Sequence, residues 1–419
     1  MKNSSYSGFF KLSTDERMKE VAEFCGLTEE EQAILRDANC LSMDKADHMI
    51  ENVIGRFAYP LGIAVNFIIN GKDYLIPMAT EEPSVVAACS NAAKMAQVSG
   101  GFTTSYTGNI MISQIQLLDV PTPAYAREKI LQNKDKIAKI CNAEDPMLVS
   151  LGGGVKDVEV RVLDSIIGPM VIVHLLVDTG DAMGANAVNT MAETAAPFLE
   201  ELSGGRTELR ILSNLADRRL ASATAVFRKD VLGGEEVVDK IIAAYAFAAA
   251  DPYRATTNNK GIMNGVIPVV IATGNDTRAI ESGAHAYAAR SGKYSPLATW
   301  EKNSDGDLVG TIEIPAAVGL VGGATKIHPA AKTAVKMLGV KTASELAQII
   351  AAVGLAQNLA AIKALATEGI QRGHMSLHVR NLAATAGASG EVLEKIVKQM
   401  VAEKNVHLEY AQELLKRYQ

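Results

Sequence analysis

The sequence lacks the features that are typical of secreted, membrane-spanning and metal-clasped proteins. Its 419 residues include 4 cysteines and no C-x-x-C pair, which argues against a zinc knot or a disulfide framework. Residues 1–11 have one early lysine and no apolar signal segment. The longest apolar runs, such as residues 170–177, are interrupted by histidine or proline well before the roughly 20 residues that cross a bilayer. We therefore expect a cytoplasmic protein with no membrane segment.

Charge of one sign is also scarce. Lys and Arg total 41 against 47 Asp and Glu, a net charge of -6, and no basic stripe is interleaved with aromatic residues. This pattern gives no reason to expect a nucleic-acid partner. No G-x-G-x-x-G opens a helix after a strand, so a Rossmann fingerprint is missing. The hydrophobic content of 48% is that of an ordinary globular protein with two or three domains.

Residues 255–276 contain the strongest candidate for a chemical site. The run 266–272 is almost entirely β-branched and apolar, which predicts a strand covered on both faces. Lys260 and Asn264 precede it and would share one face of a helical turn. Gly274 permits a sharp turn after it and leaves Asp276 at its far end. A lysine and an aspartate around one buried strand predict a cleft that holds both.

Simpler interpretations remain open for these charges. Asp276 precedes a helix-like run at 277–290 and is a good N-cap residue, and Lys260 alone could be a solvated charge. Glu82 stands just before the alanine-rich helix expected at 85–97, where proline and acidic residues favour a helix start. A carboxylate at such a turn, beside an exposed Ser84, is also a geometry in which a general acid can be presented to a substrate.

The rest of the chain alternates helices and strands. Short amphipathic helices are expected before residue 36, and Asn70-Gly71 between two β-rich runs predicts a hairpin. Residues 111–212 predict a βαββαβ unit of ferredoxin-like layout. Its elements are a strand at 111–118, a helix at 123–141, strands at 158–163 and 170–176, a helix at 181–202 and a strand at 208–212. Small residues at 181–186 stand at a helix start, where backbone amides can approach an anion.

The last part of the chain adds a glycine-rich loop, GLVGG at 319–323, and a long apolar helix expected at 343–370. His374 and His378 follow at i and i+4, but Met375 stands where H-E-x-x-H requires glutamate, so we expect no zinc site. Gly373 and the hinge at 387–390 suggest a mobile segment. Two amphipathic helices in the last thirty residues could close as a lid.

Seven motifs together resemble the class II, bacterial and archaeal, 3-hydroxy-3-methylglutaryl-coenzyme A (HMG-CoA) reductases. They are ENVIG at 51–55, EPS at 82–84, DAMGAN at 181–186, NKGIMN at 259–264, TGND at 273–276, GLVGG at 319–323 and GH at 373–374. They occur in the family's order and cover nearly the whole chain. The resemblance implies reduction of HMG-CoA to mevalonate and free CoA with two hydrides from a nicotinamide cofactor.

The resemblance also assigns roles to residues. Lys260 would stabilise the oxyanion that each hydride transfer creates, and Asp276 would keep that lysine charged and oriented. His374 would protonate the departing CoA thiolate, and Glu82 would supply the proton for the mevaldehyde oxygen. The substrate contacts carry over to Ser84, Arg254 and Asn264, with Arg254 suited to a carboxylate of the HMG group.

The cofactor positions carry over in the same way. The expected cofactor-binding residues are Asp145, Asp181, Met183, Gly184, Asn186, Asn214, Gly322 and Gly323. Asp145 matches an acidic position that in NADH-preferring members contacts the adenine ribose, where a carboxylate would repel a 2′-phosphate. The resemblance therefore favours NADH over NADPH, although Lys134, Lys136 and Lys139 could accommodate a phosphate. Coenzyme A enters as part of the substrate, and no metal is implied.

The expected fold class is α+β. We expect a large mixed α/β substrate domain (1–109 and 215–372), an inserted, non-Rossmann cofactor domain (110–214) and a small carboxyl-terminal helical flap (373–419) that carries His374. Family members are homodimers or assemblies of dimers with shared active sites, and residues 51–55 match the dimerisation stretch. Two alternatives accompany this reading: the same enzyme run oxidatively on mevalonate, and a CoA-metabolite sensor without catalysis.

Overall fold

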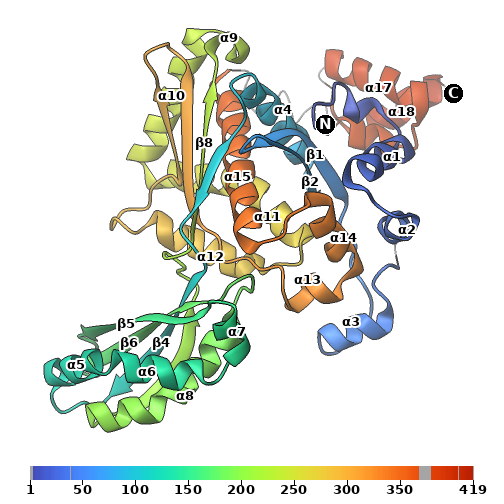
Figure 1. Ribbon diagram of the computed structural model, residues 1–419. Coiled ribbons are helices and arrows are strands. Elements are labelled where there is room, and N and C mark those ends of the chain that lie inside the picture. The colour runs from blue at the N-terminus through green and yellow to red at the C-terminus, as the bar shows by residue number, and fades with distance from the viewer. Residues whose placement is uncertain (1–2, 38, 368–378, 404, 419) are drawn as a thin grey trace.

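The computed structural model describes residues 3–37, 39–367, 379–403 and 405–418. Figure 1 shows a large body with a smaller unit projecting from one end. The strands are β1 (Leu61–Ile69), β2 (Lys72–Ala79), β3 (Thr103–Tyr106), β4 (Ile110–Leu118), β5 (Gly154–Leu163), β6 (Met170–Asp178), β7 (Arg206–Ser213), β8 (Leu220–Phe227), β9 (Ala298–Lys302) and β10 (Leu308–Pro315).

Helices surround these strands. They are η1 (Phe9–Lys11), α1 (Thr14–Cys25), α2 (Glu29–Arg36), α3 (Met43–Met49), α4 (Val85–Gln97), α5 (Pro123–Gln132), α6 (Lys134–Asn142), α7 (Pro146–Ser150), α8 (Ala185–Ser203), α9 (Lys229–Leu232), α10 (Glu235–Ala250), α11 (Pro252–Ala272), α12 (Thr277–Ala288), α13 (Gly323–Ile327), α14 (Pro329–Leu338), α15 (Ala343–Ala366), α17 (Gly390–Glu403) and α18 (Leu408–Tyr418).

The projecting unit is built on one antiparallel sheet of order β5-β6-β4-β7. Its elements follow one another as strand, helices, two strands, helix and strand, which is the βαββαβ order of a ferredoxin-like layout. α5, α6 and α8 pack on the sheet around a core of its own. The single helix that we expected at 123–141 is divided at Asn133 into α5 and α6.

The large body holds a second antiparallel sheet of order β3-β8-β10-β9. The chain leaves this sheet from β3 into β4 and returns from β7 into β8, so two neighbouring connections join the two units. The hairpin β1-β2 packs on α4, α11 and α14. Its turn is the predicted Asn70-Gly71, and both residues have the positive φ (50° and 75°) that a tight hairpin turn needs.

The strand that we expected at residues 266–272 is wrong. These residues form the end of α11, a helix that packs against α15, α10 and β2 and is buried on most of its surface. An apolar run of this length fits a buried helix as well as a buried strand, because both lack an exposed face that would reveal the period. The candidate site therefore lies on one continuous helix.

Four buried side chains fix the rotation of α11 about its own axis. Trp300 Nε1 donates to Asn358 Oδ1 at 2.8 Å, and Asn358 Nδ2 donates to Asn258 Oδ1 at 3.0 Å. Asn259 binds the backbone of residues 295–297 with both ends of its amide. Asn258, Asn259 and Asn358 are 4%, 0% and 1% exposed, so their amides bond to protein and not to solvent, and turning α11 would break these bonds.

α15 is long and apolar enough to cross a membrane by composition. In this structure it is instead a central core helix, covered by α11, α4, α10 and β8. Helices at the centre of globular proteins commonly have such a composition. The location of the protein in the cell stays a prediction.

Replacing Asn358 with alanine should lower the free energy of unfolding by about 2–4 kcal/mol, because it leaves the Trp300 indole N–H and the Asn258 carbonyl oxygen buried without partners. Urea unfolding followed by Trp300 fluorescence would measure the loss. Asn91→Ala on the exposed face of α4 is the matched control, with an expected change within about 0.5 kcal/mol. Equal stability of the two variants would show that the network does not hold α11.

Candidate active site

Lys260, Asn264 and Glu82 form one polar cluster on the exposed side of α11. Lys260 Nζ donates a hydrogen bond to Glu82 Oε2 at 3.0 Å, and Asn264 Nδ2 donates to Glu82 Oε1 at 3.3 Å. The side chains of Lys260 and Glu82 are 63% and 34% exposed. A pair so open to solvent contributes at most about 1 kcal/mol to stability. It leaves an acid and a cation side by side, within reach of a small molecule.

The turn before α4 presents Glu82 to this cluster. Glu82 N donates to Thr80 Oγ1 at 3.3 Å, and the helix begins only at Val85, with no acidic residue in its first turn. The simple capping interpretation of Glu82 is therefore wrong, since its carboxylate points to α11. Ser84 has φ 74°, a left-handed conformation that is strained for serine and that accumulates at functional sites.

Asp276 lies at the amino end of α12, and its N-cap interpretation is confirmed. Its Oδ1 accepts from Arg278 N at 2.9 Å and from Ala279 N at 3.2 Å, and it pairs with the Arg278 guanidinium at 3.1 Å. From Lys260 to the end of α11 the chain rises by about 18 Å, at 1.5 Å per residue. Within one chain, Lys260 thus binds Glu82 while Asp276 binds Arg278.

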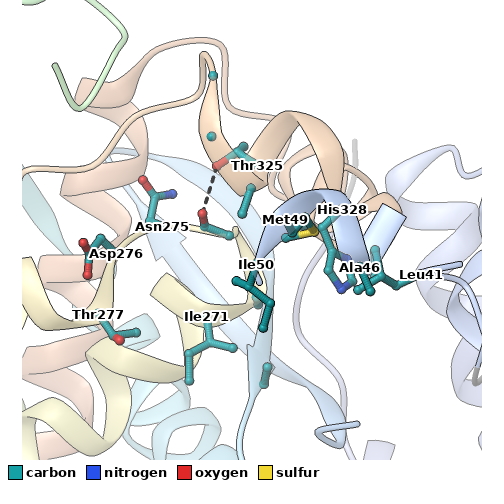
Figure 2. A pocket seen from close by; sticks show the side chains of 18 of the residues that line it. Leu41, Ala46, Met49, Ile50, Ile271, Asn275, Asp276, Thr277, Thr325 and His328 are labelled. Atoms are coloured by element: carbon teal, nitrogen blue, oxygen red, sulfur yellow. Dashed lines mark hydrogen bonds between the residues drawn. The ribbon is translucent and has the colours of Figure 1, made fainter. Parts of the chain in front are cut away.

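Asp276 faces a large cavity of about 1710 Å³ between the two units. Figure 2 shows Asn275 and Asp276 on one side of this space and Met49 and His328 on the opposite side. The extended segment 50–59 lines it as well and exposes several apolar side chains. These are Ile50, Ile54, Phe57 and Tyr59.

Most of the predicted cofactor residues line this same cavity. They are Asp145, Met183, Gly184, Asn186, Gly322 and Gly323. Gly184 caps α8, a 19-residue helix whose first amides open into the space, where they can bind an anion such as a pyrophosphate. A Cβ at Gly184 would lie 2.3 Å from Thr179, so this close approach of backbone requires glycine. The arrangement fits a dinucleotide.

Two predicted cofactor residues have other surroundings. Asp181 ties the unit to the large body, because its Oδ1 accepts from Ala343 N at 2.7 Å and its carbonyl oxygen accepts from Leu320 N at 2.9 Å. Asn214 is exposed at the connection between the two sheets. Neither residue lines the cavity.

Arg254 lies one helical turn into α11 and is half-buried. Burial lowers the pKa of its guanidinium, which remains charged at neutral pH. In the described ranges its side chain has no hydrogen-bond acceptor or ion-pair partner. A partly desolvated, uncommitted guanidinium is suited to a carboxylate or phosphate of a ligand.

The sequence analysis missed two residues that join the loops around the cavity. Arg219 is completely buried and binds the loop before α8, and Asn275 Oδ1 accepts from Gly319 N at 2.8 Å. An arginine just before a strand gives no sign of its burial, whereas Asn275 was visible inside the TGND motif at 273–276. His374 lies outside the described residues. Within the described ranges, no three His, Cys, Asp or Glu side chains are grouped as a metal site.

Comparisons with known proteins agree with one family over almost the whole chain. The sequence model of hydroxymethylglutaryl-coenzyme A reductase matches residues 13–379. The chain is 62% identical over 416 residues to a 3-hydroxy-3-methylglutaryl-coenzyme A reductase of Archaeoglobus fulgidus, covering 99% of this chain and 95% of that protein. A probable enzyme of the same name from Borreliella burgdorferi is 37% identical, covering 91% and 89%.

Solved structures give the same result. A 3-hydroxy-3-methylglutaryl-coenzyme A reductase from Streptococcus pneumoniae superposes with a TM-score of 0.85 at 42% identity, covering 99% of this chain and 100% of that one. The class II enzyme from the same organism, bound to NADPH in open conformations, superposes with a TM-score of 0.84 at 42% identity, covering 87% and 100%.

Proposed function

The chain belongs to the hydroxymethylglutaryl-coenzyme A reductase family, and on this premise we propose how its residues perform the reaction. It is an NAD(P)H-dependent oxidoreductase of the mevalonate pathway that reduces HMG-CoA to mevalonate and CoA. The observation that carries the assignment of roles is the cluster of Lys260, Glu82 and Asn264, which joins a cation, an acid and an amide donor on one accessible face.

Bound NAD(P)H supplies two hydrides, and both are consumed at the same carbon of the substrate. The first addition converts the thioester carbonyl to a hemithioacetal alkoxide, and Lys260 stabilises this negative charge by a hydrogen bond and by its own charge. Collapse of the hemithioacetal releases mevaldehyde and the CoA thiolate. The second addition, at the aldehyde carbon, creates an alkoxide that takes up a proton to give mevalonate.

Glu82 is the proton donor for the mevaldehyde oxygen. The carboxyl group is held by Lys260 and Asn264, so an oxygen bound at Lys260 also lies beside Glu82. His374, from the flap at 373–419, protonates the CoA thiolate and prevents it from attacking the aldehyde again; its ordinary pKa of about 6.5 suits that task.

Ser84, Arg254 and Asn264 hold the substrate. Ser84 offers a hydroxyl that makes no cap hydrogen bond with α4, and Arg254 offers its free guanidinium to the carboxylate of the HMG group. Asn264 shares a face of α11 with Lys260. These three contacts place the thioester carbonyl over the polar cluster.

The large cavity binds the dinucleotide through 110–214 as the cofactor domain, with the large domain in two parts, 1–109 and 215–372. The α8 amides and Gly322-Gly323 surround the pyrophosphate, beside Met183 and Asn186. Asp181 and Asn214 support this domain without lining the cavity. The Asp145 carboxylate, held by Leu148 N at 2.9 Å, faces the adenine ribose and favours NADH.

The active site is completed by a second copy of the chain. In one chain Lys260 and Asp276 bind different partners, and the apolar side chains at 50–59 beside Asp276 are uncovered. An isologous dimer that buries this segment would bring Asp276 of one subunit to Lys260 of the other, where it keeps the lysine charged. Physiological direction, synthesis or degradation of mevalonate, depends on the metabolite pools.

Replacing Lys260 with alanine should lower kcat by at least about 10²–10³-fold, because the alkoxide then lacks its cation. NAD(P)H oxidation with HMG-CoA, followed at 340 nm, measures the loss. The variant should fold normally, with a Tm within about 2 °C of the wild type, since the ion pair is exposed. Lys240→Ala, which removes an equally exposed ion pair with Glu236 on α10, is the matched control. Retained turnover in the Lys260 variant would refute the assignment, and CoA binding by the wild type without turnover would favour the sensor hypothesis.

Mixing two inactive variants tests the shared site. If Lys260 and Asp276 act across subunits, each Lys260→Ala/Asp276→Asn heterodimer has one intact site, and random exchange should restore about a quarter of the wild-type activity. Co-expression with two different affinity tags isolates the heterodimer. If both residues serve one site from the same chain, every site in the mixture keeps a defect, and the absence of any recovery would contradict a shared site.

Replacing Asp145 with asparagine should lower the KM for NADPH about tenfold, since it removes a like charge from the 2′-phosphate while the amide oxygen keeps the bond to Leu148 N. The KM for NADH should stay within about twofold. Glu144→Gln, at the exposed neighbouring position, is the matched control. Initial rates with both coenzymes give the comparison, and an unchanged NADPH KM in D145N would exclude Asp145 as the specificity residue.

A further inference from the structure

Arg219 is the largest charged side chain inside this protein and has an exposed fraction of 0%. It lies on the returning connection between the two units, directly before β8. Its backbone carbonyl accepts from Ala316 N at 3.0 Å, so the main chain is already anchored to the large body. The guanidinium is therefore carried on a fixed point between the two domains.

The guanidinium binds both domains at once. On the cofactor domain, Nη1 donates to Thr179 Oγ1 at 3.2 Å and to the carbonyl oxygens of Ala182 and Met183 at 3.3 and 3.2 Å. On the large body, Nη2 donates to the carbonyl oxygen of Val318. Nε donates to Tyr106 Oη at 2.7 Å, on the outgoing connection.

These bonds replace the water that a charged group requires. Among the ion pairs of the described residues, none includes Arg219, so carbonyl and hydroxyl oxygens alone balance its charge. A guanidinium buried in this way is stable only while its acceptors remain in place. The energetic demand of one side chain thus holds two loops from different domains at a fixed separation.

Both loops form the wall of the cofactor cavity. The first, residues 179–184, ends at Gly184, the cap of α8, and the second, residues 318–323, ends in Gly322 and Gly323. They lie in direct contact, since a Cβ at Gly319 would be 2.4 Å from Met183 N. A β-bridge between Ala182 and Val321 continues this contact.

We propose that Arg219 is a positioning residue for the dinucleotide cofactor: it clamps residues 179–184 of the cofactor domain to residues 318–323 of the large domain and thereby sets the cavity wall that receives the pyrophosphate. This inference rests on the proposed binding of NAD(P)H in that cavity. It assigns Arg219 no contact with substrate and no part in proton transfer, and so it predicts an effect on cofactor affinity that is separable from the effect on HMG-CoA.

Arg219→Lys keeps the positive charge but loses the planar fork that reaches both loops. We expect the KM for the nicotinamide coenzyme and the dissociation constant of NADH, measured by its fluorescence, to rise about 10- to 100-fold. The KM for HMG-CoA should change by less than about twofold, because the Lys260 cluster is untouched. Tyr106→Phe removes only the Nε partner and should give a smaller rise in the same constants.

Arg218→Lys is the matched control, since the neighbouring arginine is exposed and pairs with Glu159 at 3.1 Å. Its constants should equal those of the wild type. Unchanged NADH binding in both R219K and Y106F, with only a lower Tm, would overturn the proposal in favour of a merely structural role, and so would an equal rise in both KM values. Wild-type protein that binds NADH but does not turn over HMG-CoA would instead contradict the proposed function and leave the NADH-binding comparison intact.

Discussion

The structure depends on the orientation of α11 (Pro252–Ala272). This helix is surrounded by apolar elements except along the face that carries Lys260 and Asn264. An α-helix turns by 100° per residue, so a small rotation would bury the lysine and expose apolar side chains. The buried amides of Asn258 and Asn259, directly before Lys260 in the sequence, prevent that rotation because each has partners that exist in one orientation only. The chemistry of the exposed face thus relies on hydrogen bonds in the interior.

Local patterns predicted those parts of the fold that local physics decides. Asn70-Gly71 predicted the hairpin because two adjacent residues with positive φ permit few other structures. Alternating apolar residues predicted the strands of the βαββαβ unit, where one face is covered and the other is not. The same reasoning failed at residues 266–272, because what covers that segment on all sides is α15, about 80 residues further along the chain. No local signal separates a strand from a helix when the rest of the fold supplies the burial.

The site was predictable to a similar degree. The residues around 82–84 and 259–264 were found together, and the structure joins Glu82 to Lys260 and Asn264. Asp276 was placed beside Lys260 on the assumption of a short strand, and a helix of that many residues separates them instead. Arg219 was missed because burial of an arginine is a property of tertiary structure, visible only when the carbonyl oxygens of Ala182, Met183 and Val318 converge on it. Asp181 was found through its motif, yet it acts on the backbone of Ala343.

The exposure of the Lys260–Glu82 pair explains why one chain is insufficient. At 63% exposure, the ammonium group of Lys260 is screened by water, and a screened charge stabilises an alkoxide weakly. An effective oxyanion site has to exclude that water when the substrate is bound. The chain has two segments able to do so: the apolar residues at 50–59, which a second copy would cover, and the helical unit around α17 and α18, which follows His374 in the sequence. Dimerisation and flap closure are therefore electrostatic requirements of the reaction, since they convert a solvated ion pair into a desolvated one at the moment when negative charge develops.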